Sequence, residues 1–444
     1  MSKLKVKVRG LGLVPLFEYV FMLVMVVYMA QMTAATSRMM GSLGSPFLPF
    51  LLPIVLIAIL YSRHPVSFKD RRLLILLGVL ALWCVLSLVK IGGVATEDIS
   101  FMFFIFYAMV VAYLMVRIFG KSLFVLYEDI MAKFCLITLA FWLFSILLPS
   151  VAETLFSIFP ETPNGRNVLF IYHWMDPESV GMLGESYFLR NAGISWEPGR
   201  FAIMVILALL VNLSRNGLRF VKGRNILTSN PRLILFFATI CSTISTTGVI
   251  VALVLVVIFL LKNLTRQRLI VFAVVLIPIM VFVGTRNFVM GKIVKQLDSE
   301  TVMQDLEKLA DWFSLTTDDS EYGFSLDRLP SMYFEGMNVV HSPLLGYTTN
   351  SKHSYFYEFS TNIVLCGGLI KVFGQFGLLL GLFFYWILWK SSVAMSRIFP
   401  YAGKFTLMLT ILLCAISYQV FLVPVYTAVW FYGYFEKKKD AVEP

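Results

Sequence analysis

The run LeuLeuIleLeuLeuGlyValLeuAlaLeuTrpCysValLeuSerLeuVal (73–89) contains no charged residue, and it is bounded by Arg71 and Arg72 on one side and Lys90 on the other. A helix that crosses the hydrocarbon core of a bilayer needs roughly 17–25 mostly apolar residues in a row. This run meets that requirement, and its basic flanks are typical of a membrane-spanning helix at the lipid–water boundary.

Similar runs recur from one end of the chain to the other. Hydrophobic residues make up 59% of the 444 residues and charged residues only 14%, whereas soluble domains average about 45–50% and 25%. We therefore predict an all-α polytopic membrane protein that forms a single integral membrane domain over residues 1–444. The predicted spans, about twelve in number, are 14–32, 46–61, 73–89, 100–116, 131–149, 199–213, 231–245, 247–261, 269–285, 372–390, 404–420 and 421–435.

The formal net charge of +11 is unevenly distributed along the chain. Lys and Arg concentrate in alternate short loops, and most of the acids lie in the loops between them. Cytoplasmic loops of membrane proteins carry such a basic excess, so we expect both termini in the cytoplasm. The positive charge then reports topology, and we expect no nucleic-acid partner. The basic loops are 3–9, 63–72, 215–232, 262–268 and 437–439.

Two loops, 150–198 and 286–371, are much longer than the rest. Loops of this length in a compact fold are usually functional or disordered, and the aromatic residues in these two favour order. The same charge rule places both on the face away from the cytoplasm, which is the periplasmic face if the protein lies in a bacterial inner membrane. A capping-box pattern at 301–304 predicts a short helix within the second loop.

The chain lacks the common signatures of nucleotide and metal sites. It has no P-loop, no HExxH and no ligand cluster among its four histidines, which are the usual markers of such sites. We therefore expect no metal and no cofactor.

The first long loop ends in ArgAsnAlaGlyIleSerTrpGluProGlyArgPheAla (190–202). Pro198 suits the first turn of a helix, and Glu197 before it faces the positive end of the helix dipole. Arg200 then lies in that first turn, near the lipid headgroups. Arg190 and Arg200 have two open interpretations, because interfacial arginines either extend to the headgroups or bind phosphate with their planar donor fork.

The order of several short motifs resembles the O-antigen polymerase (Wzy) branch of the O-antigen ligase/polymerase superfamily. The motifs are GlyIleSerTrpGluProGlyArgPheAla (193–202), SerThrThrGly (245–248), and an arrangement of Arg328, ProLeuLeuGly (343–346), His353 and Gly377-Leu378. The resemblance covers residues 185 to 385, and the first five spans match in hydropathy alone.

This resemblance implies a metal-independent glycosyltransferase with a GT-C-like membrane fold. Such enzymes join glycans carried on undecaprenyl pyrophosphate at the outer face of the bacterial inner membrane. In the ligase branch, arginines hold the pyrophosphate and a histidine activates the acceptor hydroxyl; by position these are Arg190 and His353. The chain departs from ligases at His353, which precedes Ser where ligases carry Asn, and at 245–248, where it lacks their arginine. The first departure makes His353 a looser match, and the second favours the polymerase branch.

The chemistry of the residues agrees with this interpretation. Glycosyl transfer from a pyrophosphate carrier builds negative charge on the leaving group, which cationic side chains stabilise, and the acceptor hydroxyl needs a base. We predict His353 or Glu197 as the base. The expected pyrophosphate ligands are Arg190, Arg200, Arg328 and Arg286, and weaker candidates for sugar contact are His341, Tyr347, Tyr355 and Trp174.

The expected partners are undecaprenyl-pyrophosphate-linked oligosaccharides, the lipid bilayer and a chain-length regulator protein. Two alternatives stay open: a ligase that moves glycan to the lipid A core, and a flippase or transporter of lipid-linked oligosaccharide. A flippase predicts charged residues inside the spans. The predicted spans contain few of them, since Glu18 and Lys371 lie near span ends.

Overall fold

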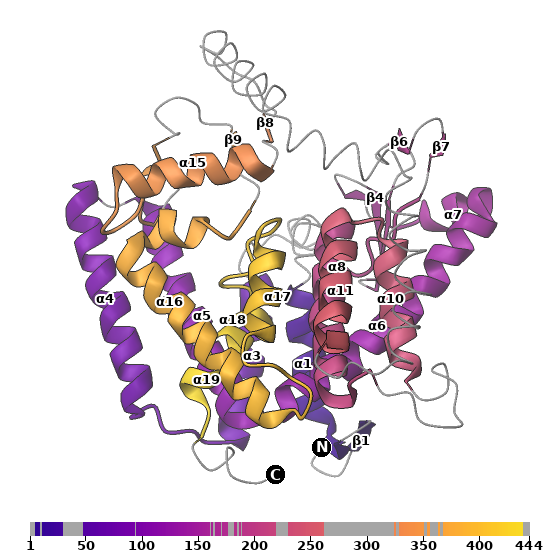
Figure 1. Cartoon of the computed structure of the whole chain (residues 1–444), viewed down its shortest axis with the longest axis horizontal. Helices are drawn as coiled ribbons and strands as arrows, with labels where there is room; N and C mark the ends of the chain where they lie inside the picture. Colours follow the sequence, from indigo (N-terminus) through magenta and orange to yellow (C-terminus); the bar gives the residue numbers. More distant parts are fainter. Residues whose placement is uncertain are drawn as a thin grey trace.

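The computed structural model of the chain is mostly helical (Figure 1). It describes residues 5–8, 11–29, 48–93, 95–159, 161–162, 165–169, 171–175, 182–183, 186–187, 189–218, 230–261, 324–325, 328–349, 353–355, 363–364 and 367–437. The predicted span 269–285, the helix predicted after residue 300 and Arg286 lie outside these residues.

The helices are α1 (Leu16–Met29), α3 (Leu48–Arg63), α4 (Arg71–Ile91), α5 (Thr96–Phe119), α6 (Ser122–Leu147), α7 (Pro149–Phe156), α8 (Pro198–Asn216), α10 (Pro231–Ser242), α11 (Thr246–Leu261), α15 (Arg328–His341), α16 (Lys371–Ile398), α17 (Thr406–Ala415), α18 (Pro424–Trp430) and α19 (Tyr432–Phe435).

Short strands accompany these helices. Strands β1 (Lys5–Val8) and β2 (Gly12–Pro15) form a hairpin, and β3 (Glu161–Thr162), β4 (Gly165–Val168) and β5 (Tyr172–Met175) form an antiparallel sheet. Two further pairs are β6 (Met182–Leu183) with β7 (Ser186–Tyr187), and β8 (Phe324–Ser325) with β9 (Ile363–Val364).

Among the described residues, five helices are long and apolar enough to cross a membrane: α4, α5, α6, α8 and α16. Helices α1, α3, α10, α11 and α17 are apolar but shorter. These helices indicate a membrane-embedded all-α protein. The total of about twelve spans stays a prediction, and the predicted last span, 421–435, is divided between α18 and α19.

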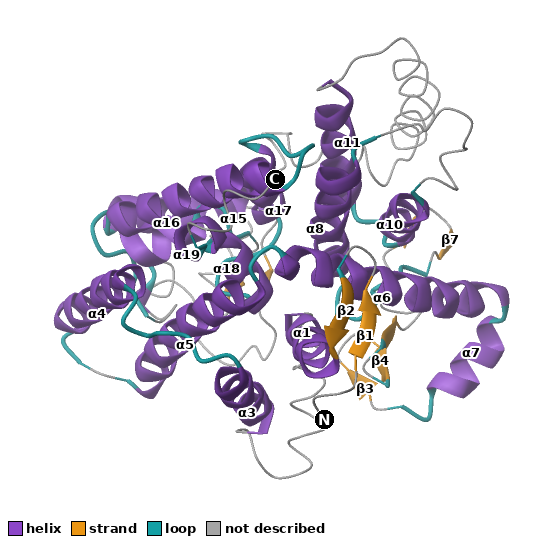
Figure 2. Cartoon of the chain, turned by 90° about the horizontal axis from the view of Figure 1, so that it is seen from below, coloured by secondary structure: helices purple, strands orange, loops and turns teal. Residues whose placement is uncertain are grey.

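Burial distinguishes the helices that face lipid from those at the centre. Only 28% of the apolar window of α4 is buried, whereas 89% of that of α8 is. Exposed Leu74, Val85 and Val89 make α4 a lipid-facing helix, because aliphatic side chains are the favoured contacts of a bilayer. Helix α8 packs against α6, α10, α11 and α17. In both views, α4 and α16 lie on one side of the molecule and α6 and α10 on the other (Figures 1 and 2).

The two ends of the bundle differ. The chain termini lie at one end, and α15, α7 and the β4–β5 hairpin lie at the opposite end (Figure 1). Both long loops therefore contribute their described parts to the same end, away from the termini. The hairpin is fixed there by a buried cluster of Ala152, Phe156, Val168, Tyr172 and Trp174.

Helix α6 begins at Ser122, nine residues before the predicted span 131–149. It therefore carries Glu128 and Asp129 into the bundle, where their side chains are 1% and 3% exposed. The predicted span 131–149 leaves both acids in the loop before it, and the sequence predicts few charges inside the spans. The two carboxylates can be buried in the bundle because basic and amide side chains of neighbouring helices pair with them.

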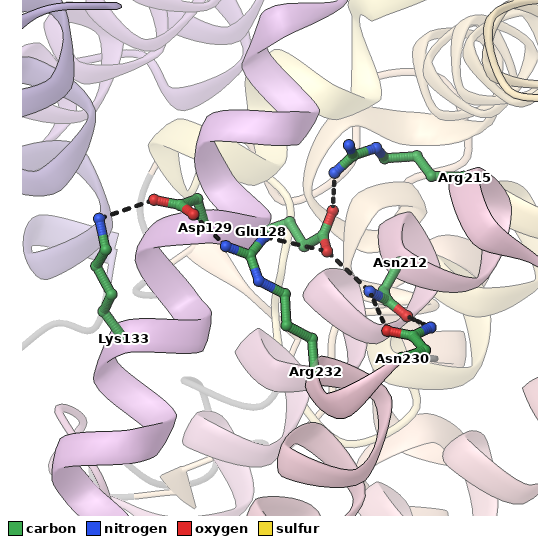
Figure 3. A network of polar contacts seen from close by, with 7 residues as sticks. All are labelled: Glu128, Asp129, Lys133, Asn212, Arg215, Asn230 and Arg232. Carbon is green, nitrogen blue, oxygen red and sulfur yellow. Dashed lines mark hydrogen bonds and ion pairs between the residues drawn. The ribbon is translucent and has the colours of Figure 1, made fainter. Parts of the chain in front are cut away.

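Glu128 is the centre of this network (Figure 3). Its carboxylate accepts hydrogen bonds from Arg215 at the end of α8 and from Asn212 Nδ2 at 2.8 Å, and Arg232 Nη1 in the first turn of α10 lies 3.5 Å away. Arg232 also pairs with Asp129. Lone charges buried in a bundle are costly, but paired ones are tolerated. The network thus joins α6, α8 and α10 near the end that holds the termini.

Candidate functional site

The segment that leads into α8 is fastened to the end of α10. The backbone N–H of Asn191 donates to Ser242 O at 3.0 Å, and Asn191 Nδ2 donates to Ser242 Oγ at 2.9 Å. Asn191 Oδ1 accepts from the N–H of Gly193 at 2.9 Å. Gly193 has a φ of +59°, and a Cβ there would lie 2.3 Å from the Phe201 ring. A glycine is required here by both backbone angle and space.

Arg190 lies beside the turn between α10 and α11. Its Nε donates to Thr243 O at 3.1 Å, and its Nη2 lies 3.5 Å from Ile244 O. Carbonyl groups at a helix C-terminus attract a cation. Burial lowers the pKa of Arg190, whereas the nearby Tyr418 and Glu197 raise it. Arg190 therefore stabilises the turn with part of its donor fork, and no hydrogen bond given for the described residues uses its Nη1.

Glu197 occupies the N-cap position of α8 and accepts a hydrogen bond from the hydroxyl of Tyr418. The two side chains meet because Gly199 has none: a Cβ there would lie 2.3 Å from Tyr418 Oη. The glycine of the GluProGlyArg motif thus makes room for a tyrosine more than two hundred positions later in the chain.

Tyr418 itself lies in residues 416–423, where the chain leaves the helical path between α17 and α18. Gly368 contacts this break closely, because a Cβ there would lie 2.5 Å from the Cα of Gln419. The N–H of Gly368 also donates to Ala415 O at 2.6 Å. Non-helical backbone inside a membrane bundle is tolerated where it is buried in protein or lines a cavity.

Arg200, in the first turn of α8, lies next to this break. It lines a small cavity together with Ile203, Met204, Tyr418, Gln419, Val420, Val423 and Tyr426. Glu197 and Tyr418 lie within electrostatic range of Arg200. The Tyr426 hydroxyl donates to Ile203 O at 2.7 Å, which holds α18 against α8.

Arg328 is the first residue of α15 and comes from the second long loop. It lies within electrostatic range of Arg190 and Tyr418. Its Nε is buried and has no hydrogen-bond partner among the described residues. A buried donor of this kind costs free energy unless a ligand satisfies it. We call Arg190, Arg200, Arg328, Glu197 and Tyr418 the arginine cluster.

The arginine cluster combines three cations and one carboxylate from distant parts of the sequence. Both long loops contribute to it, and so does the break between α17 and α18. It therefore has an excess of positive charge in a half-buried setting at the end of the bundle opposite the termini. Such an arrangement suits an anionic group with several oxygen acceptors, because each guanidinium can donate two parallel hydrogen bonds.

His353 has a different partner. Its Nε2 lies 3.3 Å from Oδ1 of Asp98, a buried residue in the first turn of α5. Asp98 Oδ1 also accepts a hydrogen bond from the hydroxyl of Thr349. None of the described hydrogen bonds or ion pairs joins His353 to the arginine cluster, so the two predicted bases, His353 and Glu197, belong to separate groups of contacts.

The predicted sugar-contacting residues are engaged by the protein itself. His341 stacks on Tyr355 with ring centroids 3.9 Å apart, and the N–H of Tyr355 donates to Asn338 Oδ1 at 2.9 Å. Tyr347 is buried, and burial raises its pKa well above the ordinary value. Trp174 packs on Phe156 inside the hairpin cluster.

The ProLeuLeuGly and GlyLeu motifs are packing elements. Gly377 has a φ of +79° inside α16, and a Cβ there would lie 2.1 Å from Leu344 O. The N–H of Leu378 donates to Pro343 O at 2.7 Å. Gly346 has a φ of +69°, and a Cβ there would lie 2.4 Å from the Gln375 backbone. These motifs lock the loop after α15 onto the kink of α16.

Sequence reasoning missed Tyr418, Asp98 and Glu335. The polar triplet Ser417-Tyr418-Gln419 within an apolar run was the available signal for the first. Glu335 lies on the buried face of α15, where burial raises its pKa, whereas Lys371 and Asn338 lower it. Nothing in its local sequence separates Glu335 from an exposed helical acid.

Comparisons with family models, with curated proteins and with solved structures give no match to this chain.

Proposed function

We propose that the chain is a membrane glycosyltransferase that polymerises undecaprenyl-pyrophosphate-linked oligosaccharide repeat units into O-antigen or a similar surface polysaccharide. The observation that supports this most is the arginine cluster, in which the buried Nε of Arg328 has no partner among the described residues. A pyrophosphate offers the oxygen acceptors and the negative charge that such a cluster favours.

The proposed reaction needs no metal. The acceptor hydroxyl attacks the anomeric carbon of the donor, the bond to the carrier pyrophosphate breaks, and the leaving group takes the electron pair. Preorganised cations in a partly dry site stabilise the charge that develops on the leaving group. Arg328 and Arg200 would contact the pyrophosphate, and Arg190 would contribute its Nη1 donors.

The hydroxyl proton needs a base within hydrogen-bond reach. We propose His353 for this role. Glu197 accepts a hydrogen bond from Tyr418 and lies within electrostatic range of Arg190 and Arg200, so its carboxylate is already engaged by the protein. Glu197 and Tyr418 would instead hold the arginine cluster in shape.

The proposed setting is the bacterial inner membrane, with a GT-C-like fold, both termini in the cytoplasm and the arginine cluster on the periplasmic face. The basic loops near the termini support this orientation. The expected partners are the lipid-linked oligosaccharides, the bilayer and a separate chain-length regulator.

A transporter is the alternative from another class, and the network around Glu128 gives it one argument, because ionisable residues inside a bundle often mark a transport path. The acids of that network are, however, paired with Arg215, Arg232 and Lys133. These pairs lie near the ends of α8 and α10, so they suit an anchor between helices better than a path.

The decisive experiment uses the purified protein in nanodiscs with a fluorescent undecaprenyl-pyrophosphate-linked repeat unit. We expect a ladder of polymer that persists in EDTA. Arg328→Lys should shorten the ladder, whereas Arg166→Lys, a change at a half-buried arginine that pairs with exposed Glu161 on the β3–β4 hairpin, should leave it unchanged.

Other outcomes would identify another activity. Transfer to a lipid A core acceptor without a ladder would indicate a ligase. Movement of the labelled lipid across the bilayer of sealed proteoliposomes without any new glycosidic bond would indicate a flippase. A ladder that is lost in EDTA and restored by Mg²⁺ would contradict the metal-independent mechanism.

A further inference from the structure

Asp98 has two carboxylate oxygens with different partners. Oδ2 accepts the N–H of Ala95 at 3.1 Å, which completes the N-terminal cap of α5. Oδ1 faces away from the cap, accepts the hydroxyl of Thr349 and lies 3.3 Å from His353 Nε2. The helix cap accounts for the contact of Oδ2 alone, so the contacts of Oδ1 need another explanation.

The surroundings make this pair unusual. Asp98 is fully buried, whereas the side chain of His353 is 28% exposed. Thr349 and His353 belong to the second long loop, and Asp98 comes from a transmembrane helix some 250 positions earlier. The contact between Asp98 and His353 is an ion pair by distance, without the alignment of a full hydrogen bond. Contacts of catalytic groups are often loose until substrate binds.

We propose that Asp98 is a positioning residue, which holds His353 with Nε2–H toward its Oδ1 and leaves Nδ1 free to accept a proton. This inference rests on the proposed function. In the transfer step, the acceptor hydroxyl would give its proton to Nδ1, its oxygen would bond to the anomeric carbon, and the carrier pyrophosphate would leave with the electron pair. The buried carboxylate would then stabilise the imidazolium that forms.

A neighbouring carboxylate has this effect for a physical reason. A histidine nitrogen that donates to an acceptor fixes the tautomer, so the other nitrogen keeps its lone pair. Thr349 contributes by donating to the same oxygen, which keeps Oδ1 oriented. Lys90 of α4 lies in the same region. Its Nζ donates to Ser342 Oγ and Gly346 O, at 2.5 and 2.6 Å, and not to Asp98.

The test uses Asp98→Asn, which can keep the cap through its amide oxygen while it loses the charge that faces His353. With the lipid-linked repeat unit as substrate, we expect His353→Ala to lower kcat by roughly 10²–10⁴-fold. Asp98→Asn should lower kcat at least about tenfold with little change in KM. The double variant should be no slower than His353→Ala alone, because residues that act as a unit are non-additive.

A purely structural role for Asp98 gives a different result. The double variant would then be slower than His353→Ala alone. The lower activity of Asp98→Asn would also be accompanied by a lower unfolding temperature. Asp70→Asn is the control, because Asp70 also caps a helix start, as the N-cap of α4 that accepts the N–H of Arg72, but lies far from His353 in the proposed topology. It should leave kcat unchanged in the fraction that folds.

A second measurement keeps this inference separate from the proposed function. In ¹⁵N-histidine NMR spectra, assigned with His353→Gln, the wild-type His353 should be the Nε2–H tautomer and Asp98→Asn should change its nitrogen shifts. If the tautomer is unaffected by Asp98→Asn, the inference is wrong even for an active polymerase. If the tautomer responds but no polymer forms, the positioning role holds and the proposed function fails.

Discussion

Replacement of Arg328 by lysine tests the arginine cluster most directly. Lysine keeps the positive charge but loses the planar fork, so it can make one hydrogen bond to a phosphate where arginine makes two parallel ones. A hydrogen bond to a charged group contributes about 1.5–3 kcal/mol. Loss of one such bond should therefore lower kcat/KM for the lipid-linked donor roughly 10–150-fold.

The structure separates this effect from a loss of stability. The buried Nε of Arg328 has no partner among the described residues, so lysine breaks no contact of that atom and should leave the unfolding temperature nearly unchanged. Arg190 is the internal comparison, because its Nε donates to Thr243 O. Arg190→Lys should lower the free energy of unfolding by about 1 kcal/mol in addition to its effect on turnover.

The assay measures initial rates of ladder formation in nanodiscs over a range of donor concentrations, together with thermal unfolding of each variant in the same nanodiscs. An Arg328→Lys enzyme with wild-type kcat/KM would show that no bidentate contact forms at this position. A lower rate accompanied by an equal loss of unfolding temperature in Arg328→Lys would show that Arg328 is structural.

Three further predictions concern the topology, the charge network and a buried acid. Cysteines at Ile158 and Val340, both more than 70% exposed, should react with an impermeant thiol reagent in intact spheroplasts, whereas one at Lys69 should react only after lysis; the reverse pattern would invert the orientation. Glu128→Gln should lower the free energy of unfolding by about 3–5 kcal/mol, because it leaves buried arginines without their acid; a wild-type denaturation curve would contradict this. Burial raises the pKa of Glu335, so the folded state binds this proton more tightly than the unfolded state. Protonated Glu335 therefore stabilises the folded state fully below the pKa that this group has in the unfolded chain, and this stabilisation is lost as the pH rises through its folded pKa. Over that range, wild type should lose stability relative to Glu335→Gln. A constant difference in unfolding temperature between the two would refute the assignment.

Several features of the protein follow from the sequence alone. The long uncharged runs predict membrane helices, because a bilayer core excludes charge along the whole length of a span. The alternation of basic loops predicts that both long loops share one side of the membrane, and their described parts lie at the same end of the bundle, opposite the termini (Figure 1). Pro198 predicts the start of α8, and Glu197 is its N-cap.

The candidate site shows the limit of local patterns. Arg190, Glu197 and Arg200 were recognisable as polar groups where the chain re-enters the membrane, and Arg328 as an arginine of the second loop. Their meeting was not predictable, because it depends on helices that pack across large separations in sequence. Tyr418 joins them only because the chain breaks between α17 and α18 and because Gly199 leaves space for the hydroxyl.

The sequence by itself determined that this is a helical membrane protein, because the hydrophobic length and charge of each segment decide whether that segment can lie in lipid. The tertiary structure decided which polar residues share an environment. It separated His353 from the arginines and gave it Asp98, and it carried Glu128 into the bundle beside Arg215. Burial and pairing of charges depend on which helices are neighbours, and that is a property of the packed chain as a whole.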